Sequence, residues 1–212
     1  MSEESFAAQR DRMVDALAES GRIEREATLE ALRAVPRHEF VPEPRREEAY
    51  ADRPLPIGDG QTVSAPHMVG IMCDRLGLAA GDDVLEIGTG CGYHSAVTAE
   101  IVGDDNVYSI EYIERLAEAA RERLDTLGYG GVSVRVGDGH EGWPEHAPYD
   151  AVYLTCATPS IPDPLVEQLR VGGRLLAPVG DTTQQLIEAT KADDGLERTQ
   201  HGAVRFVRMQ GD

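Results

Sequence analysis

The sequence predicts an α/β fold built on a doubly wound, mostly parallel sheet. Short apolar runs alternate with helical patterns between residues 84 and 177, which is typical of strand–helix–strand units with right-handed crossovers. A glycine-rich turn, Gly88-Thr89-Gly90-Cys91-Gly92, follows the first of these runs. It therefore lies at a strand end, where such sheets bind their ligands.

The composition is that of a single globular domain with an unusual charge. Of the 212 residues, 41% are hydrophobic and 27% are charged, so the chain can bury a core of its own. The 20 basic and 38 acidic residues give a net charge of −18, and Lys191 is the only lysine. Such a surface repels polyanions, so we expect no nucleic-acid partner, and it favours a halophilic host.

The three cysteines have no paired spacing, which argues against a disulfide framework and a zinc–thiolate cage. We expect no metal. No run approaches the ~20 apolar residues of a membrane span, and the acidic N-terminus lacks the basic residues of a signal peptide. We therefore expect a cytoplasmic protein that has no membrane partner.

Residues 1–60 predict a helical and proline-rich cap. Apolar positions at helical spacing in residues 5–34 indicate two helices broken at Ser20-Gly21. Five prolines then exclude long regular elements up to residue 60. The next helix is expected to use Ser64 as its N-cap and Pro66 in its first turn.

Residues 61–212 predict the α/β core of the same domain. Helices are expected over residues 96–101 and 116–127, with Gly128 just past the end of the second. We expect residues 186–190 and 204–209 to pair as an antiparallel edge. Strands are expected at residues 84–87, 107–110, 132–136, 151–154 and 175–177.

The glycine turn differs from a dinucleotide-binding fingerprint. Its spacing is G-x-G-x-G, and Tyr93 lies where that fingerprint requires a third glycine. Glu86, directly before the glycines, would repel a phosphate. The turn therefore favours a positively charged nucleoside without phosphates, and S-adenosylmethionine (SAM) fits that description.

The next two strand ends agree with a SAM site. Glu111 ends the second strand and can accept hydrogen bonds from both ribose hydroxyls. Asp138 follows the third strand between two glycines and can accept a hydrogen bond from the adenine amino group. One carboxylate at a strand end is more often a helix cap or solvated, but three matching features in order indicate SAM.

Longer motifs resemble the protein-L-isoaspartate (D-aspartate) O-methyltransferase family. The glycine turn is shared with many methyltransferases, whereas G-D-G-Q-T-V-S-A-P-H-M at residues 58–68 is specific. The resemblance implies transfer of a methyl group from SAM to the free α-carboxylate of L-isoaspartyl residues in damaged, flexible proteins, with D-aspartyl residues as an open second substrate. The motifs lie at residues 40–42, 54–57, 58–68, 84–90, 137–139 and 204–207.

The resemblance also implies roles for individual residues. Ser64 matches the active-site serine of the family, and His67 is a tentative substrate contact. The matches to cofactor-binding positions are Thr62, Val63, Glu86, Gly88, Gly90, Glu111, Asp138 and Gly139.

This chemistry needs few catalytic groups. A carboxyl with a pKa near ~4 is already ionised at neutral pH, so no general base is required. Ser64 would orient that carboxylate and would not act as a nucleophile, or it would only cap its helix, which is worth about 1 kcal/mol. The alternatives are a SAM-dependent methyltransferase with a small-molecule substrate or, against the acidic charge, a nucleic-acid substrate, a nicotinamide dehydrogenase, and a SAM-binding regulator without catalysis.

Overall fold

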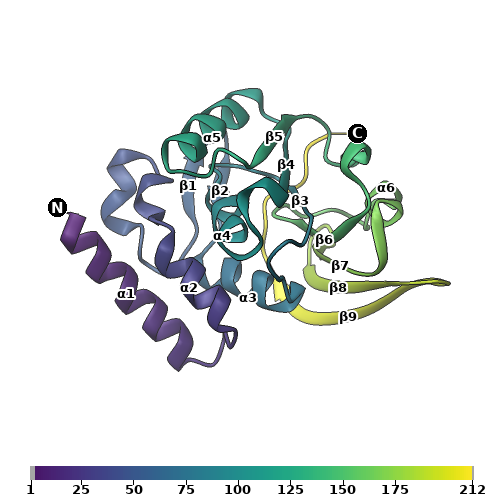
Figure 1. The fold of residues 1–212 in the computed structure, drawn as a ribbon, viewed down its shortest axis with the longest axis horizontal. Coiled ribbons are helices and arrows are strands. Elements are labelled where there is room, and N and C mark those ends of the chain that lie inside the picture. Colours follow the sequence, from purple (N-terminus) through teal and green to yellow (C-terminus); the bar gives the residue numbers. More distant parts are fainter. Residues whose placement is uncertain (1–2, 212) are drawn as a thin grey trace.

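Seven strands form one mixed sheet in this computed structural model, which describes residues 3–211 (Figure 1). Their order is β5-β4-β3-β6-β7-β8-β9; the first five run parallel, and β8 and β9 are antiparallel. The predicted fold class is therefore confirmed. The strands are β3 (Val84–Ile87), β4 (Val107–Glu111), β5 (Ser133–Val136), β6 (Tyr149–Leu154), β7 (Leu169–Val179), β8 (Gln184–Ala192) and β9 (Gly195–Val204).

Both faces of the sheet are covered, because side chains alternate along each strand. Val84 and Val107 belong to the hydrophobic core that holds the N-terminal helices, whereas Leu85 and Ile110 belong to the core on the other face. The connecting helices are α4 (Tyr93–Val102), α5 (Glu114–Thr126) and α6 (Asp163–Glu167). Within residues 3–211, no helix combines the length and apolar character needed to cross a bilayer.

The N-terminal cap packs on one side of this core. Helices α1 (Glu3–Glu19) and α2 (Glu26–Ala34) are separated at the predicted break, and α2 packs on α4 and on α3 (Pro66–Leu76) (Figure 1). Two 3-10 turns follow, at Arg37–Glu39 and Glu43–Glu48. A small antiparallel hairpin then leads into α3; its strands are β1 (Leu55–Gly58) and β2 (Gln61–Val63).

The predicted cap of α3 is wrong. The N-cap residue is Ala65, and its side chain makes no capping bond. Pro66 excludes the helical conformation from the residue before it, so Ala65 is extended and Ser64 lies outside the helix. Instead, a carboxylate oxygen of Asp52 accepts a hydrogen bond from the His67 amide at 2.9 Å.

The predicted strand at residues 204–209 is also wrong. Asp193 and Asp194 form a tight turn that pairs β8 with β9, and β9 ends at Val204. Beyond it, the side-chain amide of Gln184 bonds both backbone groups of Phe206. The C-terminal tail, residues 205–211, therefore leaves the sheet edge and crosses the strand ends, where Arg208 bridges to Ala157.

The packing of α3 against the turn that precedes α2 depends on a helical glycine. A Cβ on Gly70 would lie 2.1 Å from the Cδ1 atom of Ile23, so we expect Gly70→Ala to lower the free energy of unfolding by about 1–2 kcal/mol, despite the better helix propensity of alanine. Ile23→Val removes that Cδ1 atom. In urea denaturation, the double variant should lose less free energy of unfolding than the two single variants lose together. Strictly additive losses would contradict this packing account.

Candidate functional site

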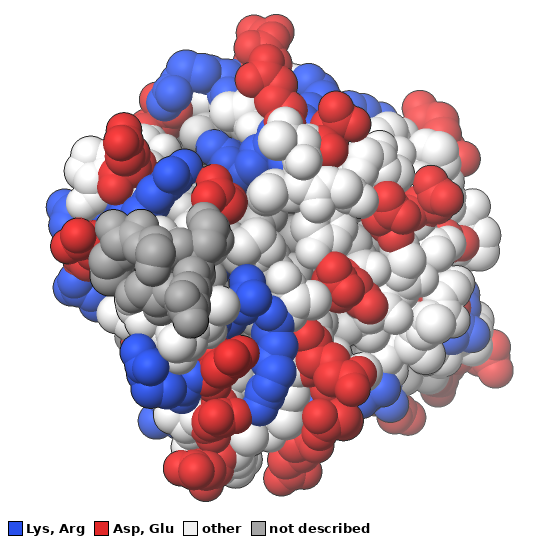
Figure 2. Space-filling view, turned by 60° about the vertical axis from the view of Figure 1, so that its left-hand side comes forward, with Lys and Arg blue, Asp and Glu red and all other residues white. Residues whose placement is uncertain are grey.

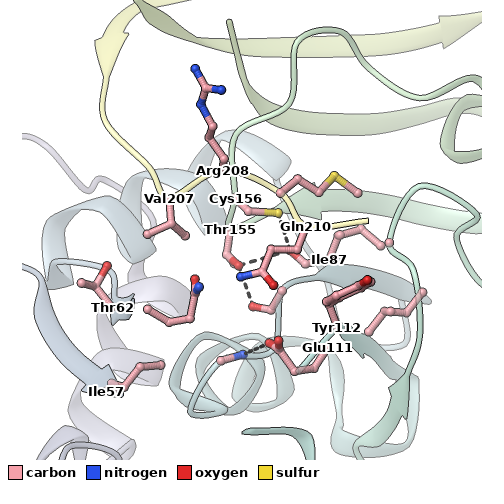
Figure 3. A pocket seen from close by; sticks show the side chains of 16 residues that line it. Ile57, Thr62, Ile87, Glu111, Tyr112, Thr155, Cys156, Val207, Arg208 and Gln210 are labelled. Carbon is pink, nitrogen blue, oxygen red and sulfur yellow. Dashed lines mark hydrogen bonds between the residues drawn. The ribbon is translucent and has the colours of Figure 1, made fainter. Parts of the chain in front are cut away.

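A cavity opens at the carboxyl ends of the central strands, where the strand order reverses (Figure 3). We call it the strand-end cavity. The β1–β2 hairpin, the glycine turn and the C-terminal tail all contribute to its wall, as do Glu111, Tyr112, Gly139 and Thr155. Open parallel sheets bind ligands at this position.

The glycine turn is tied to both neighbouring strands. The amides of Gly88 and Thr89 donate to the carbonyl of Ile110 at 2.8 and 3.3 Å. The hydroxyl of Thr155 donates to the carbonyl of Gly88 at 2.6 Å. Gly88 has φ +100°, and a Cβ there would lie 2.3 Å from the Thr155 hydroxyl. Glycine is therefore required for the backbone to form this part of the cavity.

Glu111 lies in the wall with its carboxylate fixed in place. One oxygen accepts a hydrogen bond from the Gly90 amide at 2.8 Å, and the other accepts one from the Ile113 amide at 3.0 Å. The adjacent Tyr112 is 50% exposed and also lines the cavity. Our sequence reasoning missed this residue, although its place directly after Glu111 is the signal that could have found it.

Glu86 does not line the cavity. Its side chain is fully buried below the glycine turn, where one oxygen accepts hydrogen bonds from the hydroxyls of Ser95 and of Ser109, the latter at 2.6 Å. The Ser109 hydroxyl also lies 2.6 Å from that of Thr89, inside the turn. Burial raises the pKa of Glu86 to about 7. Its position supports the turn from beneath, with no direct contact to the cavity.

Of the other residues assigned to the cofactor, some line the strand-end cavity and some do not. Thr62, Gly88, Gly90 and Gly139 line the cavity with Glu111. Val63 is buried in the core between cap and sheet. Asp138 is not among the lining residues, and one of its oxygens accepts hydrogen bonds from the amide and the Nδ1 of His140, at 2.9 and 2.7 Å.

A second cavity adjoins the first and shares Thr62, Thr155 and Val207 with it. Ser64 and His67 line this adjoining cavity together with residues 203–207 of β9 and the tail. The structure thus brings the predicted catalytic serine and substrate contact to the same cavity, directly beside the predicted cofactor residues.

A buried arginine that the sequence did not indicate holds the Ser64 segment. Arg37 is completely buried and donates hydrogen bonds to three backbone carbonyls: those of Ala49, Arg53 at 3.2 Å and Ser64 at 3.0 Å. Its guanidinium lies 5.5 Å from the ring centroid of Tyr93 at the start of α4. Arg37 therefore connects the cap, the serine segment and the helix after the glycine turn.

The strand-end cavity fits a cationic nucleoside. Ile57, Ile87 and Ile110 give it apolar walls, and Glu111 supplies a carboxylate. Its one arginine, Arg208, points away from the cavity (Figure 3) and is paired with Asp181 at 3.8 Å. The wall therefore has no inward-facing cation that could bind a phosphate. This agrees with SAM, which carries no phosphate.

Comparison with known proteins gives a consistent result over nearly the whole chain. Residues 8–212 match the family model described as protein-L-isoaspartate(D-aspartate) O-methyltransferase. Protein-L-isoaspartate O-methyltransferase 2 of Archaeoglobus fulgidus is 55% identical, over 98% of this chain and 95% of its own length. The corresponding enzyme of Methanothermobacter thermautotrophicus is 51% identical, over 96% of this chain and 95% of its own length.

Solved structures agree. A protein-L-isoaspartate O-methyltransferase superimposes with a TM-score of 0.89 at 30% identity, covering 95% of this chain and 66% of that chain. A putative enzyme of the same kind from Plasmodium falciparum, in complex with S-adenosyl-L-homocysteine, has a TM-score of 0.84 at 24% identity, with coverage of 95% and 98%. The second likeness supports the fold alone.

The buried position of Glu86 predicts a pH dependence of stability. Below pH 4.5 the carboxyl is protonated in both the folded and unfolded states, whereas between pH 4.5 and about 7 only the unfolded state releases its proton. This group therefore lowers the free energy of unfolding as the pH rises through that window. The variant Glu86→Gln, which cannot titrate, should gain stability relative to wild type from pH 4.5 to pH 7 in urea denaturation.

The exposed Glu122 provides the matched control, and Glu122→Gln should track wild type across the same range. A constant difference between Glu86→Gln and wild type at every pH would contradict the placement of a protonated carboxyl beneath the turn.

Proposed function

The chain belongs to the protein-L-isoaspartate (D-aspartate) O-methyltransferase family and is a SAM-dependent protein carboxyl methyltransferase acting on L-isoaspartyl residues; we propose that Ser64 orients the substrate carboxylate. The observation that carries this proposal is the position of Ser64 in the adjoining cavity, which shares Thr62 and Thr155 with the strand-end cavity. The family match favours this activity over the alternative of a methyltransferase with a small-molecule substrate.

The residues of the strand-end cavity divide the recognition of SAM. When bound, SAM supplies the methyl group from a sulfonium. We assign Gly88 and Gly90 to its methionine end, Glu111 to its ribose, and Gly139 with Asp138 to its adenine. Glu86 and Val63 act indirectly in this assignment, because the first supports the glycine turn and the second anchors Thr62 in the core.

Ser64 acts on a substrate group that is already a nucleophile. Its hydroxyl donates a hydrogen bond to one carboxylate oxygen and leaves the other oxygen to face the shared wall. Orientation and exclusion of water then supply the catalysis. Arg37 supports this geometry from behind, because it holds the backbone carbonyl of Ser64.

The adjoining cavity suits an extended polypeptide. Its wall includes Pro54, His67 and residues 203–207, a segment of extended chain at the end of β9 and the start of the tail. Backbone recognition gives low side-chain specificity, as repair of many damaged proteins requires. We assign His67 to substrate contact, and D-aspartyl residues stay an open second substrate.

We also propose that the enzyme works in the cytoplasm of a halophilic host, without nucleic-acid or membrane partners. Figure 2 shows acidic side chains spread over the visible face, with basic side chains between them. This distribution and the net charge of −18 support avoidance of polyanions. The three cysteines, all free and buried, suit a reducing compartment.

The role of Ser64 can be tested with two peptides that differ only in an aspartyl or isoaspartyl linkage. Wild type should place a base-labile methyl label on the isoaspartyl peptide alone. Ser64→Ala should lower kcat/KM by about 10- to 100-fold, because it removes a hydrogen bond to a charged group, with SAM affinity unchanged. Ser160→Ala, on an exposed serine outside both cavities, should match wild type; unchanged kcat/KM in Ser64→Ala would remove Ser64 from the reaction.

The charge predicts a response to salt. Raising KCl from about 0.1 M to about 2 M shortens the Debye length to a few ångströms and screens the self-repulsion of the surface. We expect a higher Tm and retained methyl transfer at the higher salt. A Tm that falls as KCl rises would contradict the halophilic assignment and leave the enzymatic one intact.

A further inference from the structure

Asp52 and His67 form a pair at the edge of the adjoining cavity. One oxygen of Asp52 accepts two hydrogen bonds from His67, from its backbone amide at 2.9 Å and from its ring Nδ1 at 2.8 Å. The other oxygen faces Arg22 at 3.7 Å. Asp52 follows the 3-10 turn at Glu43–Glu48, so a residue of the cap that does not itself line the cavity holds the His67 side chain that does.

This pairing fixes the imidazole. A carboxylate can only accept, so Nδ1 of His67 carries the proton, and in the neutral ring Nε2 is left with an acceptor lone pair. His67 lines the cavity with 29% of its side chain exposed. Among residues 3–211, no side chain or backbone group bonds its Nε2.

We propose that Asp52 is a positioning residue that holds His67 so that its Nε2 accepts a hydrogen bond from a main-chain amide of the peptide substrate. This inference rests on the proposed function. A main-chain amide is the donor that nearly every peptide offers whatever its sequence, so such a contact adds affinity without restricting the side chains beside the isoaspartyl residue.

The competing account gives Asp52 a structural role only. Its bond to the His67 amide satisfies one of the free N–H groups in the first turn of α3. Loss of that bond would destabilise α3 whether or not His67 contacts the substrate. Asp74 provides a matched control, because one of its oxygens accepts hydrogen bonds from the amides of Glu24 and Arg25, at 2.7 and 3.2 Å, just before α2. It lies outside the two cavities.

Two substitutions of His67 distinguish the contribution of Nδ1 from that of Nε2. Asn places an amide near the position of Nδ1 and does not reach the cavity, whereas Gln extends to the position of Nε2. We expect His67→Asn to raise the KM for the isoaspartyl peptide about three- to tenfold with kcat nearly unchanged, the cost of one hydrogen bond. His67→Gln should restore most of the affinity.

A double-mutant cycle tests the action of Asp52 through His67. Asp52→Asn keeps an acceptor for the helix amide but removes the charge that holds the ring, so it should raise the peptide KM in the wild-type background and leave it unchanged in the His67→Asn background. Asp74→Asn likewise keeps an acceptor but removes a charge at the start of α2, so it should lower Tm without altering the peptide KM. SAM affinity should not move in any variant.

Three outcomes would overturn the inference: equal effects of His67→Asn and His67→Gln, additive effects in the cycle, or an Asp52→Asn variant that loses Tm as Asp74→Asn does while the peptide KM stays constant. Each of these outcomes is a comparison with wild-type enzyme that methylates the isoaspartyl peptide. If wild type labels neither peptide, the proposed function fails instead, and the two failures are therefore distinguishable.

Discussion

The site depends on one buried cation. Arg37 has no exposed surface. Its two terminal nitrogens donate to the backbone carbonyls of Ala49, Arg53 and Ser64, its guanidinium lies against the ring of Tyr93, and its Nε has no hydrogen-bond partner among the described residues. Burying a charge is costly unless such partners are supplied, so the segment from residue 49 to residue 64 is constrained to the path that supplies them. That path brings the cap to the sheet and places Ser64 beside the strand ends.

A second set of buried polar groups fixes the other half of the site. The glycine turn is held at its backbone by Ile110, at Thr89 by Ser109, and at Gly88 by Thr155. Glu86 completes this set from below, although its pKa of about 7 shows that burial works against its ionisation. A preorganised turn does not have to be ordered when the cofactor binds, and this lowers the entropic cost of binding.

Much of this arrangement could be predicted from the sequence, because local signals decided it. The alternation of strands and helices, the break at Ser20-Gly21 and the end of α5 before Gly128 follow from periodicity and glycine placement. Two predictions were wrong. Ser64 looks like a cap, but Pro66 keeps Ala65 extended and moves the N-cap past Ser64; residues 204–209 alternate like a strand, but the side chain of Gln184 bonds Phe206 and β9 ends at Val204. Arg37 could not be found, since a charged residue in a proline-rich segment carries no sign of the distant carbonyls that bury it.

The tail explains why two cavities can act as one site. It crosses the strand ends between them, with its backbone tied to Ala157 through Val207 at 2.7 Å and Met209 at 2.8 Å. Val207 therefore lines both cavities, as Thr62 and Thr155 do. In-line transfer between two reactants that are already activated requires only that they meet at a fixed separation without water between them. Lining residues common to both cavities place the proposed cofactor and substrate positions next to each other, and this chemistry requires no acid or base between them.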